Sequence, residues 1–125
     1  MKIKIKFKNK EAEAELNGSE TAKQIYDALP IEAEANTWGE EIYFEIPVKM
    51  QEEQAYSRQN MHVGELAYWP RGNAFCIFFG KTPASINSEP RAISNVNVIG
   101  ALLNKKDSET FKSVKEGNKV RIEKI

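Results

Sequence analysis

Two adjacent carboxylates are the first groups in this sequence that could do chemistry. Glu40 and Glu41 follow Trp38 and Gly39 and stand at the start of an alternating apolar run. Adjacent residues of a strand point to opposite faces, so one of the two carboxylates would face the interior of a sheet or its mouth. If that residue is Glu41, it needs a partner or a raised pKa, which makes it a candidate site residue. The alternative is that both carboxylates are solvated at a turn.

Aromatic residues and one arginine extend this candidate site. Trp38, Tyr43, Tyr68 and Trp69 lie near expected turns, where they could form the rim of a pocket. Ordinary barrel packing with satisfied polar tips explains the same residues equally well. Arg91 lies in a loop, where a guanidinium could meet an anionic ligand, or could simply be exposed. The predicted ligand-binding residues are Trp38, Glu41, Tyr43, Tyr68 and Arg91.

Metal and nucleophile chemistry find little support. His62 and Cys76 are the sole residues of their types, whereas a tight zinc site uses several such ligands. Cys76 lies between Phe75 and Ile77 in an apolar run, which predicts a buried, inert thiol. His62 is expected on the surface. The glycines are spread one to a turn, so we find no glycine-rich phosphate loop and expect neither a metal nor a cofactor.

Length and composition set the class of protein. The chain has 125 residues, 41% hydrophobic and 29% charged, which predicts one globular domain over residues 1–125. Eighteen basic residues balance eighteen acidic ones, which argues against nucleic acid as a partner. A single cysteine excludes an intrachain disulfide and favours a reducing, cytoplasmic setting. No apolar window approaches the length of a membrane-spanning helix, so no membrane partner is expected.

The elements that must position these residues begin with a hairpin over residues 2–16. Lysines and then glutamates alternate with apolar residues in this segment. With Asn9 and Lys10 as the turn, Lys8 is predicted to face Glu11, so that one face is self-neutralising and the other is apolar. The charges are therefore expected to form a solvated sheet face.

The next segments contain a helix and further strands. Asn17 is predicted to cap a helix that ends at Pro30. Residues 31–47 alternate around Gly39 and predict a second hairpin. Residues 48–63 are polar and weakly patterned, which indicates either a short surface helix or a loop over a pocket.

Two apolar runs, 66–69 and 74–79, are joined by a turn in which Gly72 is expected to be left-handed. Because these runs do not alternate with polar residues, both of their faces should be covered, at the centre of the fold. The remaining predicted elements are a strand over 93–99, a helix over 108–116 and a strand over 120–122. In all, about seven or eight strands and two short helices predict a closed or nearly closed antiparallel barrel with plugged ends.

Three motifs carry a family resemblance. They are WGEEIYF at 38–44, GELAYWPRGNA at 64–74 and FFGKTP at 78–83. With these motifs the sequence resembles a family of small prokaryotic cyclophilin-like proteins along nearly its whole length. The resemblance implies a mainly β fold, a compact antiparallel cyclophilin-like β-barrel of about eight strands with two short capping helices. It implies no established biochemical role.

The isomerases that gave this fold its name use an arginine on one barrel strand, with an aromatic residue and a glutamine on the next. The comparable hairpin here, 31–47, contains neither arginine nor glutamine. The leading hypothesis is therefore a barrel that binds a small molecule or an extended peptide. One alternative is a divergent peptidyl-prolyl isomerase in which Arg91 replaces the missing arginine. The other is a non-catalytic oligomerising or interaction subunit, and the choice between monomer and homo-oligomer stays open.

Overall fold

The computed structural model describes all residues from 1 to 125 and is dominated by antiparallel strands. The strands are β1 (Lys2–Phe7), β2 (Lys10–Leu16), β3 (Ile31–Glu34), β4 (Asn36–Thr37), β5 (Glu41–Glu45), β6 (Ser57–Asn60), β7 (Glu65–Trp69), β8 (Ala74–Phe78), β9 (Arg91–Leu102) and β10 (Lys119–Lys124). The helices are α1 (Glu20–Ala28) and the 3₁₀ helices η1 (Gln54–Tyr56) and η2 (Lys105–Ser113). No helix is both long and apolar enough to cross a membrane.

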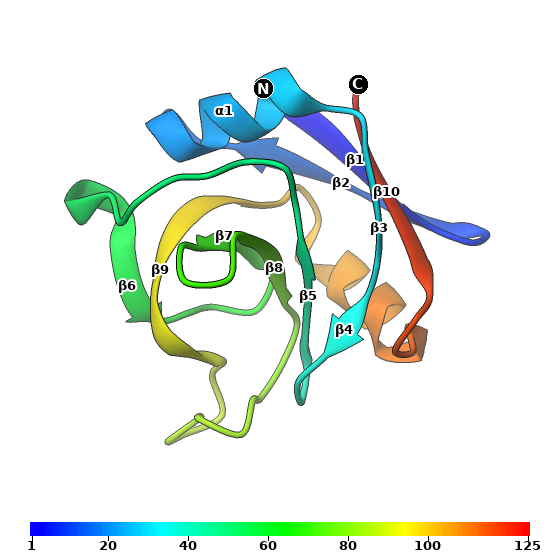
Figure 1. The fold of residues 1–125 in the computed structure, drawn as a ribbon. Coiled ribbons are helices and arrows are strands. Elements are labelled where there is room, and N and C mark those ends of the chain that lie inside the picture. Colours follow the sequence, from blue (N-terminus) through cyan, green and yellow to red (C-terminus); the bar gives the residue numbers. More distant parts are fainter.

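The ten strands form one curled sheet. Its order is β3-β10-β1-β2-β9-β7-β8-β5-β4, and β6 pairs with β9 off this path. The two ends of the path, β3 and β4, follow one another in the chain with only Ala35 between them. The sheet therefore curls into a barrel-like shape that is not closed by a last pair of strands (Figure 1). The predicted mainly β, barrel-like class is confirmed.

The first hairpin has the predicted faces but a different register. Lys6 lies opposite Glu11 and Ile5 opposite Ala12, two residues away from the predicted pairing of Lys8 with Glu11. The turn is made at residues 8–9, where Lys8 has a φ of 48°. A shift of two residues leaves every side chain on its face, so the lysine-to-glutamate matching survives.

Helix α1 is capped by a residue other than the predicted one. The Ser19 hydroxyl, not Asn17, accepts a hydrogen bond from the Ala22 N–H at 3.0 Å. The Asn17 side chain instead donates to the Val98 carbonyl at 2.8 Å and so ties the start of the helix to β9. The helix ends before Pro30, as predicted.

The segment expected as a second hairpin divides between two partners. Strand β3 pairs with β10, with Ile31 opposite Ile122. Only the short β4 turns back onto β5. The polar segment 48–63 is mostly loop, with η1 and the strand β6 at its centre.

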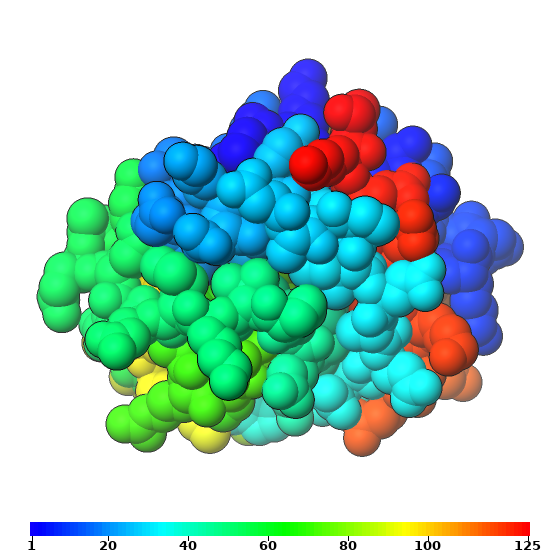
Figure 2. Space-filling model, turned by 45° about the horizontal axis from the view of Figure 1, so that its top comes forward, coloured from blue at the N-terminus to red at the C-terminus, as the bar shows by residue number.

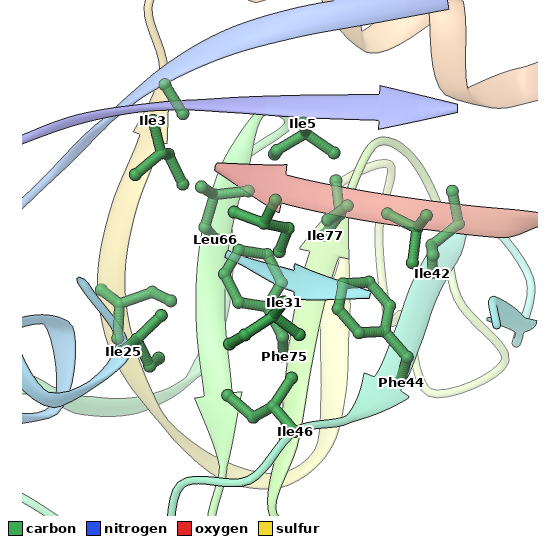
Figure 3. Packing of buried hydrophobic residues seen from close by; sticks show 14 of the residues in the cluster. Ile3, Ile5, Ile25, Ile31, Ile42, Phe44, Ile46, Leu66, Phe75 and Ile77 are labelled. Carbon is green, nitrogen blue, oxygen red and sulfur yellow. The ribbon is translucent and has the colours of Figure 1, made fainter. Parts of the chain in front are cut away.

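A main core fills the inside of the curled sheet (Figure 3). On β5, β8 and β7 this face carries Phe44, Phe75 and Tyr68, which are all at most 1% exposed. The rings of Phe44 and Phe75 stack at 5.3 Å between centroids. Strands β1 and β2 and helix α1 contribute aliphatic side chains from the other side.

A second, smaller core covers the opposite face of the same three strands. It contains Met61, Ala67, Cys76, Phe78, Ala92, Val96 and Val98. Strand β9 can reach both β7 and this face because it is long and curves strongly (Figure 1). The prediction that the apolar ribbon of β7 and β8 is covered on both faces is therefore correct.

Residues 48–53, called the strap below, cross one end of the barrel and are held there by hydrogen bonds. Asn97 is fully buried, accepts from the Glu53 N–H at 2.9 Å, and donates to the Gln51 carbonyl and the Thr21 hydroxyl at 3.0 Å. The Glu53 carboxylate accepts from the Thr21 N–H at 2.7 Å, at the start of α1. In Figure 2 this green segment lies directly against α1. The strap is thus anchored to β9 and α1, and it closes one end of the barrel.

We expect Asn97→Ala to lower the free energy of unfolding by at least about 2 kcal/mol, because it removes three hydrogen bonds made by one fully buried side chain. The partners are the Glu53 N–H, the Gln51 carbonyl and the Thr21 hydroxyl. Urea unfolding measures the loss. The exposed Asn95→Ala is the matched control and should change stability little. Equal stability of the two variants would contradict the role given to Asn97.

Candidate functional site

A cavity of about 120 Å³ opens beside the second core. Its lining consists of Trp38, Glu41, Tyr43, Trp69, Cys76, Ala92, Ile93 and Val96. Glu41 is the one lining residue that is not hydrophobic. The structure thus brings together Trp38, Glu41 and Tyr43 from the five predicted site residues, and it adds Trp69.

The alternation of β5 explains why Glu41 and Tyr43 share this cavity. Glu41 lies opposite Phe78 and Tyr43 lies opposite Cys76 on β8. Side chains two residues apart on a strand point to one face, so both reach the face of the second core. The intervening Ile42 points into the main core. Glu41 is therefore buried, but outside the barrel interior.

A tight turn before β5 fixes Trp38 and Glu41 in place. The Trp38 N–H donates to the Glu41 carbonyl at 2.9 Å, and the Glu41 N–H donates back to Trp38 at 3.2 Å. Gly39 between them has a φ of +61°, and a Cβ there would lie 2.8 Å from the Pro83 ring. Only glycine suits both the conformation and the close approach of the 81–83 loop.

Trp69 comes from the next hairpin and is held at both ends of its ring system. Its indole N–H donates to the Ser94 hydroxyl at 2.8 Å. A Cβ at Gly72 would lie 2.5 Å from the ring, so the absence of a side chain lets the turn pack against the indole. The left-handed residue of this turn is Asn73, with a φ of 49°, and not Gly72 as predicted.

Burial changes the proton affinity of Glu41. Glu41 is only 6% exposed. Desolvation raises the pKa of its carboxyl from 4.5 to about 7, and a hydrogen bond with Cys76 lowers it by a smaller amount. Desolvation, followed by the nearby Glu41 charge, raises the pKa of the Cys76 thiol well above its ordinary value. A thiol held protonated is a poor nucleophile, in agreement with the prediction of an inert cysteine.

The other two predicted site residues lie elsewhere. Tyr68 is fully buried in the main core, where its hydroxyl donates to the Val48 carbonyl at 2.6 Å and helps to hold the strap. Arg91 borders a separate depression of about 190 Å³ together with His62 and Glu89. The His62 side chain is 72% exposed, as expected of a surface residue. Tyr68 and Arg91 therefore do not converge with Glu41 on one cavity.

The largest depression of the surface, about 550 Å³, lies over β1, β10 and β3. Most of its lining residues are charged, and four of them form two ion pairs across the strands. Arg121 reaches Glu32 at 2.5 Å, and Lys119 reaches Glu34 at 3.6 Å. The depression is an open, charged sheet surface with little apolar lining. The smaller apolar cavity is therefore the better candidate for a ligand site.

Comparisons with known proteins agree with this fold. The family model described as cyclophilin-like matches residues 1–123. Among solved structures, the chain is similar to the solution structure of the hypothetical protein AF2241 from Archaeoglobus fulgidus, with 40% identity and a TM-score of 0.81. That similarity covers 100% of this chain and 95% of the other. No curated protein matches the chain.

We expect Gly39→Ala to destabilise the protein by more than about 1–2 kcal/mol, since a side chain at positive φ costs roughly that much and the new Cβ also meets the 81–83 loop. Gly117→Ala isolates the backbone effect, because Gly117 has a φ of +87° in open space. Gly18→Ala has neither problem. In urea unfolding, the loss of stability should be largest for Gly39→Ala, smaller for Gly117→Ala and smallest for Gly18→Ala. If Gly39→Ala is no less stable than Gly117→Ala, the close approach of the 81–83 loop to Gly39 is contradicted.

The raised pKa of Glu41 predicts a pH dependence of stability. The pKa of Glu41 is about 7 in the folded state and 4.5 ordinarily, so the folded state holds the proton more tightly than the unfolded state. The resulting contribution to stability is fully present only below about pH 4.5. This contribution is lost as the pH rises through 7 and amounts to roughly 3 kcal/mol. Compared with Glu41→Gln, the parent protein should lose this stability between pH 4.5 and 8 in urea unfolding. The exposed Glu45→Gln should retain the parent profile; parallel profiles for the parent and Glu41→Gln would refute the shift.

Proposed function

We propose that this chain, which belongs to the cyclophilin-like family, is a binding protein whose cavity accepts a small molecule or one side chain of an extended peptide. One observation carries the proposal. Three aromatic residues and one buried carboxyl, contributed by β5, the turn before it and β7, border a single, mostly apolar cavity. Apolar walls with few polar groups are the usual composition of ligand sites.

The size of the cavity limits what it can hold. A volume of about 120 Å³ corresponds to roughly four water molecules, which suits a group of a few heavy atoms. Ile93 at its border is 60% exposed and extends the apolar surface outward. A larger ligand would insert one group and lay the remainder along the surface beside Ile93.

Isomerase activity has weaker support. Catalysis on a prolyl bond would need a hydrogen-bond donor near the amide nitrogen, beside an apolar seat for the ring. The cavity has apolar walls, but neither arginine nor glutamine lines it, and Arg91 borders a different depression. A non-catalytic binding role is therefore the better proposal.

We also infer a cytoplasmic setting in a prokaryotic cell. The single cysteine, Cys76, is free and buried, which suits a reducing compartment. The similar solved structure comes from an archaeon, which supports a prokaryotic origin. Self-association through a strand edge remains a distinct proposal, which light scattering at several concentrations tests directly: a monomer at every concentration would remove it.

A thermal-shift screen with metabolites and short peptides should find stabilising ligands. A ligand present at 100 times its Kd adds about 2.7 kcal/mol to the stability of the folded state. Trp38→Ala and Tyr43→Ala should abolish the shift, because each removes a wall of the cavity. The exposed Ile86→Ala lies outside the cavity and should keep it. A broad panel without any stabiliser, or a shift retained by both cavity variants, would contradict the proposal.

A proline-limited refolding assay distinguishes the isomerase alternative. Uncatalysed prolyl isomerisation takes roughly tens of seconds, so acceleration is easy to detect. We expect no acceleration at micromolar protein. Acceleration that Trp38→Ala and Tyr43→Ala abolish would replace the non-catalytic proposal with a catalytic one.

A further inference from the structure

The charge and the walls of the cavity indicate which ligands it selects. We propose that it accepts a small alkylammonium head group, held among Trp38, Tyr43 and Trp69 with its positive charge toward Glu41. This inference rests on the proposed binding function and narrows it to one chemical class.

The aromatic walls favour a cation. The faces of indole and phenol rings carry negative potential, and several rings around one space attract a quaternary or alkylated ammonium. Trp38, Tyr43 and Trp69 come from three separate positions: the turn before β5, β5 itself and the end of β7. The polar N–H of Trp69 is already used by Ser94. Trp69 is thus left to contribute its ring to the cavity.

Glu41 is the one charged residue of the protein that is buried, and it has no counter-charge. Glu65 receives two hydrogen bonds from Arg58, at 2.6 and 2.7 Å, and Glu32 is paired with Arg121. Glu41 forms no salt bridge, and no lysine, arginine or histidine lines its cavity. A buried carboxylate without a cation is costly, so a cationic ligand would supply the missing partner.

Proton linkage gives this site a distinctive signature. The titratable groups that line the cavity are Glu41 from β5, Tyr43 from β5 and Cys76 from β8; the segment of β9 contributes none. Glu41, with a pKa of about 7, is the group that changes charge near neutral pH. A cation binds the ionised carboxylate better, so its affinity should rise with pH, whereas a neutral hydrogen-bond acceptor would prefer the protonated acid.

Choline and 3,3-dimethyl-1-butanol form a matched pair of probes, with the same shape and different charge. Isothermal titration of the full chain at pH 8 should show choline binding at least tenfold more tightly than the neutral alcohol. At pH 5.5 choline should bind about 30-fold more weakly than at pH 8, because a group with a pKa near 7 is then almost wholly protonated.

Variants separate the charge from the shape of the cavity. Glu41→Gln keeps the volume and should remove both the preference for choline and its pH dependence. Trp69→Leu should weaken choline at least tenfold by removing an aromatic wall. The exposed Glu45→Gln on the same strand should behave as the parent protein. A capped trimethyllysine amide, tested beside choline, shows whether a peptide side chain or a free small molecule is the better source of the head group.

Three results would overturn the inference. Equal affinities for choline and the alcohol, or a choline affinity unchanged by Glu41→Gln, would show that charge plays no part. Failure of choline and trimethyllysine amide to bind at millimolar concentration would show that the cavity does not accept alkylammonium groups. None of these results removes the proposed binding function, because the thermal-shift screen with neutral metabolites and peptides tests that function independently.

Discussion

Burial of both faces of the β5–β8–β7 ribbon organises the molecule. One face packs Phe44, Phe75 and Tyr68 into the main core, and the other lies under the curved β9 and carries Cys76 in the second core. Because side chains alternate along each strand, this single arrangement decides which residues fill the barrel and which reach the cavity. Glu41 belongs to the second face, so an acidic group lies where most of its neighbours are apolar. The sheet register therefore places Glu41, Tyr43 and Cys76 at the cavity, and the turn before β5 adds Trp38.

The position of Glu41 costs stability, and the surrounding elements hold it there. Across the turn at Gly39, the backbone groups of Trp38 and Glu41 form two hydrogen bonds with each other. The 81–83 loop packs against that turn. Trp69 is fixed by Ser94 and by the turn at Gly72. Rigid walls of this kind lower the entropy lost when a ligand binds. The same rigidity explains how a small protein can keep a carboxyl without a counter-charge in an apolar setting, because neither the turn nor the hairpin can easily move to expose it to solvent.

The sequence predicts the strands well and their partners less well. Alternation and the non-alternating ribbon correctly indicate a barrel-like sheet with a doubly covered centre. The predicted register of the first hairpin is wrong because lysines and glutamates repeat every second residue, so that any even shift keeps the charges matched. The position of the turn, at Lys8, determines the actual register. Asn17 has the residue type of a helix cap, but its side chain donates a hydrogen bond to the Val98 carbonyl of β9, which is remote in sequence. The sequence also fails to show which of Tyr68 and Trp69 reaches the cavity, because that depends on the pairing of Trp69 with Ala74. A four-residue turn at 70–73 implies this pairing, and it would have predicted that Trp69 lies on the same sheet face as Cys76 and Glu41.

A side-chain carbon NMR titration of Glu41 is the most direct test of this account. With the protein labelled at the glutamate carboxyl carbons and the resonance assigned through Glu41→Gln, the account predicts a single transition with a pKa of about 7. A transition near 4.5, the ordinary value, would mean that the carboxyl is solvated, and would contradict both the buried second face and the ligand class inferred from it.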